Sequence, residues 1–249
     1  ERWSHIAIDE AQDLSVAEAS LLGSLVHPEG AVTISADFHQ VVSPMHGMTD
    51  PSSFEVGNSM RGGAAQQQIY PFAKNMRQSK QIGLFLQGFY KAVFGEIAPF
   101  DYNDSIIDAK PRLTIAAALE FPRLIQQMFN VLNRSDTVNS IALLQINEDE
   151  ETLIRIRSHL ESLNVKLAPI WEATGEGLIT TSVERIKGLE FDACLIIGLE
   201  DVDRSSLNFA RNRAYVALSR PTRRLALLCE EFPNLLRKVD TEIFDVQRI

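Results

Sequence analysis

Residues 179–198 read ITTSVERIKGLEFDACLIIG and give a clear indication of the fold class. Two apolar runs of strand length, Leu178–Ser182 and Cys194–Gly198, lie on either side of a polar turn that contains Lys187 and Gly188. Short apolar runs bounded by turn residues are typical of strands buried inside a sheet. Further runs of the same kind occur at His5–Ile8, Ala31–Ser35, Leu113–Ala117, Ser140–Ile146 and Arg224–Cys229.

Segments with helical periodicity separate several of these strands. In Leu14–His27 a serine and a glutamate three residues later have the spacing of a capping box. Glu120–Asn133 and Glu150–Leu163 place apolar side chains at three- and four-residue steps, and Asn147 is a suitable N-cap for the second of them. Strands that alternate with helices of this length predict an α/β fold with a parallel sheet covered on both faces.

The composition changes between Ser43 and Gln68, where prolines, glycines and three consecutive glutamines replace the periodic pattern. Such a stretch is typical of a linker or a long surface loop. We therefore predict two domains, residues 1–65 and residues 66–249. The first holds only two predicted strands, too few for an independent sheet. We expect it to require strands from sequence upstream of Glu1, which would make this chain a fragment.

The overall composition favours a soluble globular protein. Hydrophobic residues make up 45% and charged residues 23%, which excludes a disordered chain. No apolar run approaches the roughly 18 residues that a membrane span requires, so no membrane association is expected. The formal net charge of −9 argues against non-specific nucleic-acid binding through a positively charged surface, but it allows a local basic groove.

Two cysteines and five histidines bear on metals and on the compartment. Cys194 and Cys229 each sit singly in an apolar run, which is typical of buried thiols in a reducing compartment. We therefore expect a cytoplasmic protein. The histidines show no spacing typical of a structural zinc site.

The first candidate site lies in Ile6–Asp13, which reads IAIDEAQD. Asp9 and Glu10 follow directly after a predicted strand, and ligands of open α/β sheets bind beyond the carboxyl ends of strands. One such carboxylate can hold Mg²⁺ on a nucleotide while the other activates the attacking water. The alternative is an acidic helix N-terminus that the helix dipole stabilises.

Four further segments carry polar side chains next to predicted strands. Ala36–Gln40 places a carboxylate and an amide after a strand, and Asn75–Arg77 ends in an arginine. Thr181 and Ser182 offer short hydroxyl donors of the kind that bind phosphate oxygens. Residues 205–229 contain five arginines and no carboxylate, which favours binding of an anion because arginine grips phosphates with a planar fork. Each segment alone has an alternative: a turn, a surface arginine, a hairpin connection, or a helix with a solvated basic face.

In this order the five segments resemble motifs II to VI of the UvrD/Rep branch of superfamily 1 DNA helicases. IDEAQD resembles the Walker B box, ADFHQ the GDxxQ box, NMRQS the NYRS box, TTSVERIKGLEF the TxHxxKGLEF box and YVALSR the YVA(L/I)TRA box. The resemblance extends from Ile6 to about Leu228. It implies RecA-like domains of the P-loop NTPase type, namely the C-terminal piece of a first domain and a complete second one. ATP would bind between these domains and single-stranded DNA would cross them.

The resemblance also implies a role for each matched residue. In the first domain, Asp9 would bind Mg²⁺ and Glu10 would activate the hydrolytic water. Gln40, together with Gln12, would sense the γ-phosphate. In the second domain, the implied roles are γ-phosphate contact for Arg77 and Arg220, nucleotide contact for Lys187, Gly188 and Glu190 (the last on the ribose), and DNA contact for Thr181 and Ser182.

The chain departs from the family pattern at several points. It contains no GxxxxGK(S/T) sequence, so we expect the phosphate-binding loop to lie upstream and the isolated chain to be inactive. Glu184 stands where the family carries a histidine, which places an acid where a DNA-facing donor is expected. Ala36 replaces a glycine and Pro221 replaces an alanine. The interval between Arg77 and Ser182 is too short for the inserted accessory domain of larger family members.

These features predict the C-terminal part of an ATP-dependent DNA helicase or translocase, which couples ATP hydrolysis to movement on single-stranded DNA. Its cofactors would be ATP and Mg²⁺, and its partners would be single-stranded DNA and the missing N-terminal part of the same protein. One alternative is a non-catalytic RecA-like module that binds DNA or a protein partner, which the substitutions at Glu184 and Ala36 favour. Another is a superfamily 1 motor that acts on RNA.

Overall fold

A computed structural model describes residues 2–42, 70–71, 74–147, 149–171, 177–205 and 209–249. The chain divides into two compact units, Glu1–Tyr70 and Pro71–Ile249, and each unit is described by itself. The loop predicted at Ser43–Gln68 lies outside the described residues, as does the predicted domain boundary after residue 65.

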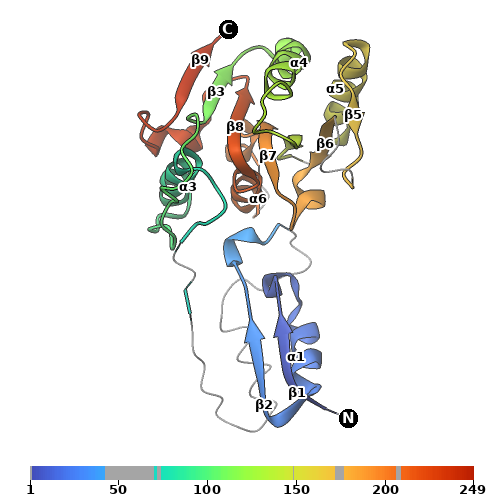
Figure 1. Cartoon of the computed structure of the whole chain (residues 1–249), viewed down its shortest axis with the longest axis vertical. Coiled ribbons are helices and arrows are strands. Elements are labelled where there is room, and N and C mark those ends of the chain that lie inside the picture. The colour runs from blue at the N-terminus through green and yellow to red at the C-terminus, as the bar shows by residue number, and fades with distance from the viewer. Residues whose placement is uncertain (1, 43–69, 72–73, 148, 172–176, 206–208) are drawn as a thin grey trace. The chain divides into compact units, whose positions relative to one another are not determined.

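The second unit is built on a seven-stranded sheet whose neighbouring strands all run parallel (Figure 1). The strands lie side by side in the order β5-β6-β4-β7-β8-β3-β9. The prediction of an α/β fold with a parallel sheet is confirmed. The strand bounds are β3 (Arg112–Ile115), β4 (Ile141–Gln145), β5 (Leu167–Ala168), β6 (Leu178–Ser182), β7 (Phe191–Ile197), β8 (Pro221–Cys229) and β9 (Asp245–Arg248).

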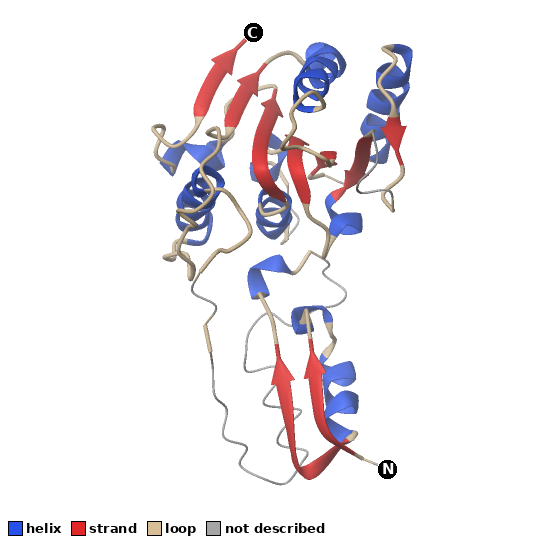
Figure 2. Cartoon of the chain, in the orientation of Figure 1, coloured by secondary structure: helices blue, strands red, loops and turns tan. Residues whose placement is uncertain are grey.

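Helices connect these strands, as Figure 2 shows. The α-helices are α3 (Lys80–Phe94), α4 (Phe121–Leu132), α5 (Glu150–Ser162) and α6 (Ala210–Leu218), and the 3-10 turns are η3 (Ala118–Glu120), η4 (Val183–Ile186), η5 (Glu200–Asp203) and η6 (Asn234–Lys238). The helices predicted at Glu120–Asn133 and Glu150–Leu163 correspond to α4 and α5 within two residues.

The predicted N-cap of α5 is wrong. Asp149 caps this helix, because its side chain accepts a hydrogen bond from the backbone N–H of Thr152 at 3.0 Å. Asn147 instead donates its side-chain amide to Asp201 at 2.9 Å, across to the chain that follows β7. A carboxylate at this position adds a favourable interaction with the positive end of the helix dipole, which an amide lacks.

Helix α3 is absent from the sequence-based prediction, although it buries seven residues. It contains two glycines, which lower intrinsic helix propensity. Both glycines lie against close neighbours: a Cβ at Gly83 would stand 2.8 Å from Cβ of Tyr102, and a Cβ at Gly88 would stand 3.1 Å from side chains of Val239 and Ile243. Close packing therefore explains the two glycines, and these glycines made the helix hard to recognise from the sequence.

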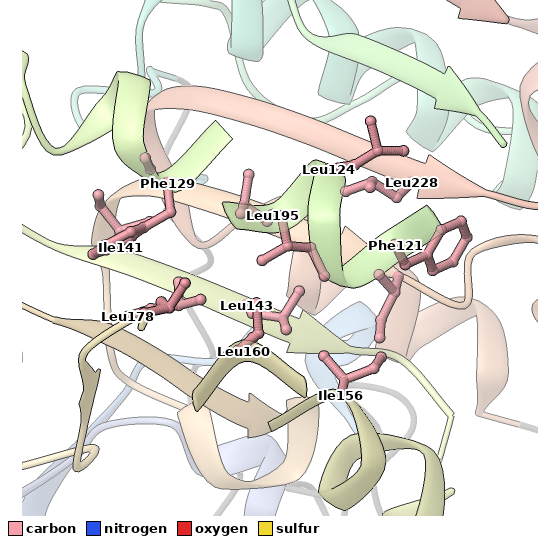
Figure 3. Packing of buried hydrophobic residues seen from close by; sticks show 14 of the residues in the cluster. Phe121, Leu124, Phe129, Ile141, Leu143, Ile156, Leu160, Leu178, Leu195 and Leu228 are labelled. Atoms are coloured by element: carbon pink, nitrogen blue, oxygen red, sulfur yellow. The ribbon is translucent and has the colours of Figure 1, made fainter. Parts of the chain in front are cut away.

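The core of the second unit lies where α4 and α5 cover the central strands (Figure 3). Leu143 of β4 and Leu195 of β7 are Cα partners in the sheet, and both are fully buried against α4 and α5 residues such as Ile125 and Leu160. The neighbour Leu144 points to the opposite face, because side chains alternate along a strand, and it is also fully buried. Burial on both faces explains why β4 reads as a continuous apolar run.

The first unit pairs two parallel strands, β1 (Trp3–Ile8) and β2 (Val26–Ile34), with one helix, α1 (Val16–Ser24), between them in sequence. The predicted capping box is present: the Ser15 hydroxyl accepts from the backbone N–H of Glu18 at 3.2 Å, and the Glu18 carboxylate accepts from the backbone N–H of Ser15 at 2.8 Å. Two 3-10 turns, η1 (Ala11–Asp13) and η2 (Phe38–Gln40), follow the strands. Within the described part of this unit α1 buries none of its side chains.

Cys194 and Cys229 are free and buried, as predicted. Burial raises the pKa of both thiols above their ordinary value, so neither is a reactive thiolate. None of the helices in the described part of the chain combines the length and the apolar character of a membrane span.

We expect Leu143→Ala to lower the free energy of unfolding by about 2–5 kcal/mol, because it removes a fully buried side chain at the centre of the sheet. Denaturant titration of the chain measures this change. Ile154→Ala on α5, where the side chain is 59% exposed, is the control and should shift stability by about 0.5 kcal/mol or less. Equal losses for the two variants would contradict the assignment of the core.

Candidate functional site

The candidate residues of the first unit follow β1 in an unusual backbone conformation. Glu10 has a φ of 50° and a ψ of 39°, in the left-handed region that non-glycine residues seldom occupy. The exposed carboxylate of Asp9 accepts a hydrogen bond from the backbone N–H of Glu10 at 3.0 Å. Strained backbone of this kind is concentrated at functional sites, so the conformation singles out this turn.

Hydrogen bonds join this turn to the chain after β2. The side-chain amide of Gln12, which is fully buried, donates to a Glu10 carboxylate oxygen at 2.5 Å, and its carbonyl oxygen accepts from the backbone N–H of Asp37 at 3.0 Å. Asp37 in turn accepts from the side-chain amide of Gln40 at 2.9 Å. The predicted residues Glu10, Gln12 and Gln40 therefore belong to one polar network at the carboxyl ends of the two strands.

In the second unit, three segments distant in sequence meet at the amino ends of β7 and β8. Phe191 and Pro221 are Cα partners at the starts of these strands, and the backbone N–H of Phe191 donates to the carbonyl of Arg220 at 3.1 Å. The buried side chain of Gln78 donates to the carbonyl of Ser219 at 2.9 Å, and Ser79 N–H donates to the carbonyl of Thr222 at 2.8 Å. Backbone contacts thus bring together the segments around residues 77, 190 and 220.

Two of the predicted nucleotide contacts pair with each other at this meeting point. Arg77 Nε lies 2.5 Å from Glu190 Oε1, and the two side chains are 44% and 42% exposed. Both groups are therefore accessible from solvent. The ion pair places a cation and an anion side by side at the amino ends of β7 and β8, a place that we call the polar rim. An exposed pair of this kind contributes little to stability, which leaves either partner able to exchange it for a ligand.

Arg220 is placed differently. Its side chain is only 3% exposed, and its guanidinium donates to the carbonyls of Val216 and Leu189 at 3.0 and 3.3 Å and to the Ser219 hydroxyl at 3.0 Å. In this structure the group holds the end of α6 to the turn before β7. To contact a phosphate, Arg220 would have to exchange at least one of these bonds.

The turn expected at Lys187 and Gly188 is present. Gly188 has a φ of 77°, and nothing lies within 4 Å of the position that a Cβ would take. The constraint at this residue is therefore the backbone conformation and not space. The turn directs the chain from the end of η4 to Glu190 and the start of β7.

Thr181 and Ser182 are the last residues of strand β6. They lie at the carboxyl ends of the parallel strands, whereas Arg220 lies at the amino ends. Thr181 is 3% exposed, whereas Ser182 is half-buried. Of the two predicted DNA contacts, Ser182 is thus the one whose side chain reaches the surface.

Glu184 stands where the resemblance leads one to expect a DNA-facing histidine, and the structure gives this acid a partner. Its Oε1 lies 3.1 Å from Nε of Arg213, and the Arg213 side chain is 5% exposed. The pair joins η4 to α6. Arg224, another arginine of the 205–229 stretch, pairs with Asp108. The protein's own carboxylates therefore offset part of the charge that was expected to require an external anion.

Sequence reasoning missed Gln78 and Arg213. Gln78 lies beside a predicted arginine, but nothing in its sequence context distinguishes a buried amide from a surface one. Arg213 lies within the basic stretch, and its pairing with Glu184 over 29 positions in sequence depends on the packing of α6 against η4.

The residues present fit Mg²⁺ that is carried on a nucleotide. Among the described residues, no group of three or more His, Cys, Asp or Glu side chains could hold a metal ion. Mg²⁺ in nucleotide sites usually takes one or two carboxylates and fills its remaining positions with water and phosphate oxygens. The exposed carboxylate of Asp9 meets this requirement.

Comparison with known proteins shows a likeness of fold. No protein-family model and no curated protein matches the chain. Among solved structures, the chain is similar to the C-terminal domain of a possible DNA helicase from Lactobacillus plantarum WCFS1, with a TM-score of 0.53 and 15% identity. The match covers 69% of this chain and 99% of that domain. At this identity the finding establishes a shared α/β architecture.

We expect Glu184→Ala to lower the free energy of unfolding by roughly 1–3 kcal/mol, because the buried Arg213 guanidinium would lose a charged hydrogen-bond acceptor. Glu231→Ala, which breaks the exposed Arg204–Glu231 pair, is the matched control and should cost less than about 1 kcal/mol. Urea titrations of both variants measure the difference. A smaller loss for Glu184→Ala than for the control would show that the pair is not structural.

Proposed function

We propose that this chain is the C-terminal part of an ATP-dependent DNA helicase or translocase that moves along single-stranded DNA. The observation that supports this most is the meeting of three segments, distant in sequence, at the amino ends of β7 and β8. Arg77, Glu190 and Arg220 lie in these segments, and the resemblance to the helicase motifs implies a nucleotide contact for each of them. The fold of the solved helicase domain is in agreement with the proposal.

The proposed roles divide between binding and chemistry. Asp9 would hold the Mg²⁺ that accompanies ATP, and this ion would neutralise charge on the phosphates. Glu10 would orient and deprotonate the attacking water, while its bond from Gln12 keeps the carboxylate in place. Gln40 would report the γ-phosphate through the same network.

Most of the residues with proposed roles in the second unit lie at the polar rim, at the amino ends of β7 and β8. Arg77 would leave Glu190 and stabilise negative charge on the γ-phosphate, and Glu190 would then accept hydrogen bonds from the ribose. Lys187 and Gly188 would approach the nucleotide through the turn before β7. Ser182, and less directly the buried Thr181, would contact the DNA backbone at the carboxyl end of β6.

A non-catalytic module is the second candidate, and the burial of Arg220 favours it. A guanidinium that donates to two carbonyls and a hydroxyl of its own unit has a structural role without any nucleotide. In that case the unit would bind DNA or a protein partner without turnover.

ATP hydrolysis by the full-length parent protein separates these candidates. We expect DNA-stimulated hydrolysis that falls about 10²–10⁴-fold in Glu10→Gln, because the water loses its base. The hydrolysis rate of Arg77→Ala should be roughly 10³–10⁵-fold lower than that of the wild type, because the transition state loses a stabilising guanidinium. Arg134→Ala, at an exposed arginine after α4, is the control and should keep wild-type activity. Activity that survives both changes would exclude the proposed roles, and no activity in the wild type would favour the non-catalytic module.

For the isolated 249-residue chain we expect no ATP turnover, because its sequence lacks a phosphate-binding loop with its lysine. A phosphate-release assay with and without single-stranded DNA tests this. Hydrolysis that the chain catalyses, and that Glu10→Gln abolishes, would show that the loop is dispensable.

A further inference from the structure

The buried amide of Gln78 connects the two arginine-bearing segments of the polar rim. Gln78 directly follows Arg77 in the chain and is only 3% exposed. Its Nε2 donates a hydrogen bond to the carbonyl of Ser219 at 2.9 Å, across 141 positions of the sequence. Ser219 is the residue before Arg220. One side chain therefore joins both segments from which the γ-phosphate contacts are proposed to come.

Asn75 holds the Arg77 end of this link. Its Oδ1 accepts hydrogen bonds from the backbone N–H groups of Arg77 and Gln78, at 3.1 and 3.2 Å. Its Nδ2 donates to Gln78 Oε1 at 2.6 Å, so both ends of the Gln78 amide are bonded. The turn that carries Arg77 and the amide of Gln78 are thus held together as one unit.

Ser219 holds the Arg220 end. Its hydroxyl donates to the Val216 carbonyl at 2.8 Å and accepts from the Arg220 guanidinium at 3.0 Å. The bond from Gln78 goes to the backbone carbonyl of Ser219. It therefore anchors the peptide that leads into Arg220 and does not depend on where the guanidinium of Arg220 lies.

The two ends of the link differ in how firmly the fold holds them. Ser219 is 7% exposed and follows α6, where residues 214–218 are all buried. The turn that carries Arg77 lies at the surface, since Met76 is 68% exposed and the Arg77 side chain is 44% exposed. Gln78 therefore anchors a surface turn to the core of the unit.

Backbone bonds already attach the start of α3 without this side chain. The N–H of Ser79 donates to the Thr222 carbonyl at 2.8 Å, and the N–H of Lys80 donates to the Ile106 carbonyl at 2.7 Å. Both bonds are available whatever side chain stands at position 78. The amide of Gln78 thus adds a connection between the residues next to Arg77 and Arg220, beyond what attachment of the helix requires.

We propose that Gln78 is a positioning residue that places Arg77 beside Arg220 for their joint contact with the γ-phosphate. This inference rests on the proposed function, which assigns both arginines to ATP. Gln78 is buried, so it acts through Arg77 and does not itself contact the nucleotide. Catalysis by positioned groups is sensitive to geometry, and a misplacement of about 1 Å can cost about 10²-fold in rate.

Placement by the backbone matters at Arg77 because its side chain has to change partner. Nε of Arg77 lies 2.5 Å from Glu190 Oε1 in this structure. Once a phosphate replaces Glu190, the position of the guanidinium depends on the turn that Asn75 and Gln78 hold. A loosened turn would let Arg77 bind ATP in several geometries, of which few stabilise the transition state.

The test compares DNA-stimulated ATP hydrolysis by the full-length parent protein and by its Gln78→Met variant. Methionine is unbranched and close to glutamine in length, but it donates no hydrogen bond, so packing is kept while the link to Ser219 is lost. We expect kcat to fall about 10–100-fold while KM for ATP changes less than about two-fold, because Arg77 acts on the transition state.

Gln87→Met is the matched control. Gln87 lies on α3, away from the polar rim, and its Nε2 donates to the Phe100 carbonyl at 2.7 Å. This variant loses a bond of the same kind, so urea titration should show similar losses of stability for both variants, whereas only Gln78→Met should lower kcat. An equal fall in kcat for the two variants would overturn the proposal, because lost stability would then explain it.

A double-mutant cycle tests whether Gln78 acts through Arg77. In an Arg77→Ala background the guanidinium is gone, so Gln78→Met should lower the residual kcat by no more than about two-fold. A further fall of about 10–100-fold in that background would show an independent effect and overturn the proposal.

Asn75→Ala keeps the proposal testable if Gln78→Met does not fold. It frees the turn at a half-buried side chain and should give the same separation of kcat from KM. Wild-type kcat in folded Gln78→Met or Asn75→Ala, in a protein that Arg77→Ala inactivates, would overturn this inference alone. A wild-type protein without DNA-stimulated hydrolysis would overturn the proposed function and this inference with it.

Discussion

The parallel pairing of β7 with β8 is the constraint on which the arrangement of the second unit depends. Because Phe191 and Pro221 start these strands as partners, the residues just before each strand must lie side by side. This pairing brings the carbonyl of Leu189 within reach of the Arg220 guanidinium. Gln78 then adds the third segment through Ser219. The polar rim is therefore a product of strand register, which hydrophobic burial of β7 and β8 maintains.

The arginine-rich stretch shows how composition alone can mislead about partners. Five arginines without a carboxylate suggest an external anion, but acids distant in sequence reach two of them in the folded chain. Glu184 pairs with Arg213, and Asp108 pairs with Arg224. The resemblance suggests that Glu184, in place of a histidine, removes a DNA contact. In the structure the same residue forms an ion pair that joins η4 to α6.

The sequence was informative where the signal is local or periodic. The buried strands follow from short continuous apolar runs, and the capping box of Ser15 and Glu18 follows from residue spacing; both are present. Helix α3 was missed because its glycines serve contacts with residues far along the chain, which no local pattern records. Charge and polarity also gave no indication that the Arg220 side chain is buried, since its acceptors are backbone carbonyls that every residue carries.

The left-handed backbone at Glu10 has a consequence for how this chain can change. A residue with a Cβ is disfavoured there by roughly 1–2 kcal/mol, whereas glycine adopts the conformation freely and asparagine does so at reduced cost. Selection for heat resistance alone would therefore favour exchanging the acid for one of these residues. At this position thermal robustness and the retention of a carboxylate are opposing demands, and the strain is the physical measure of that conflict.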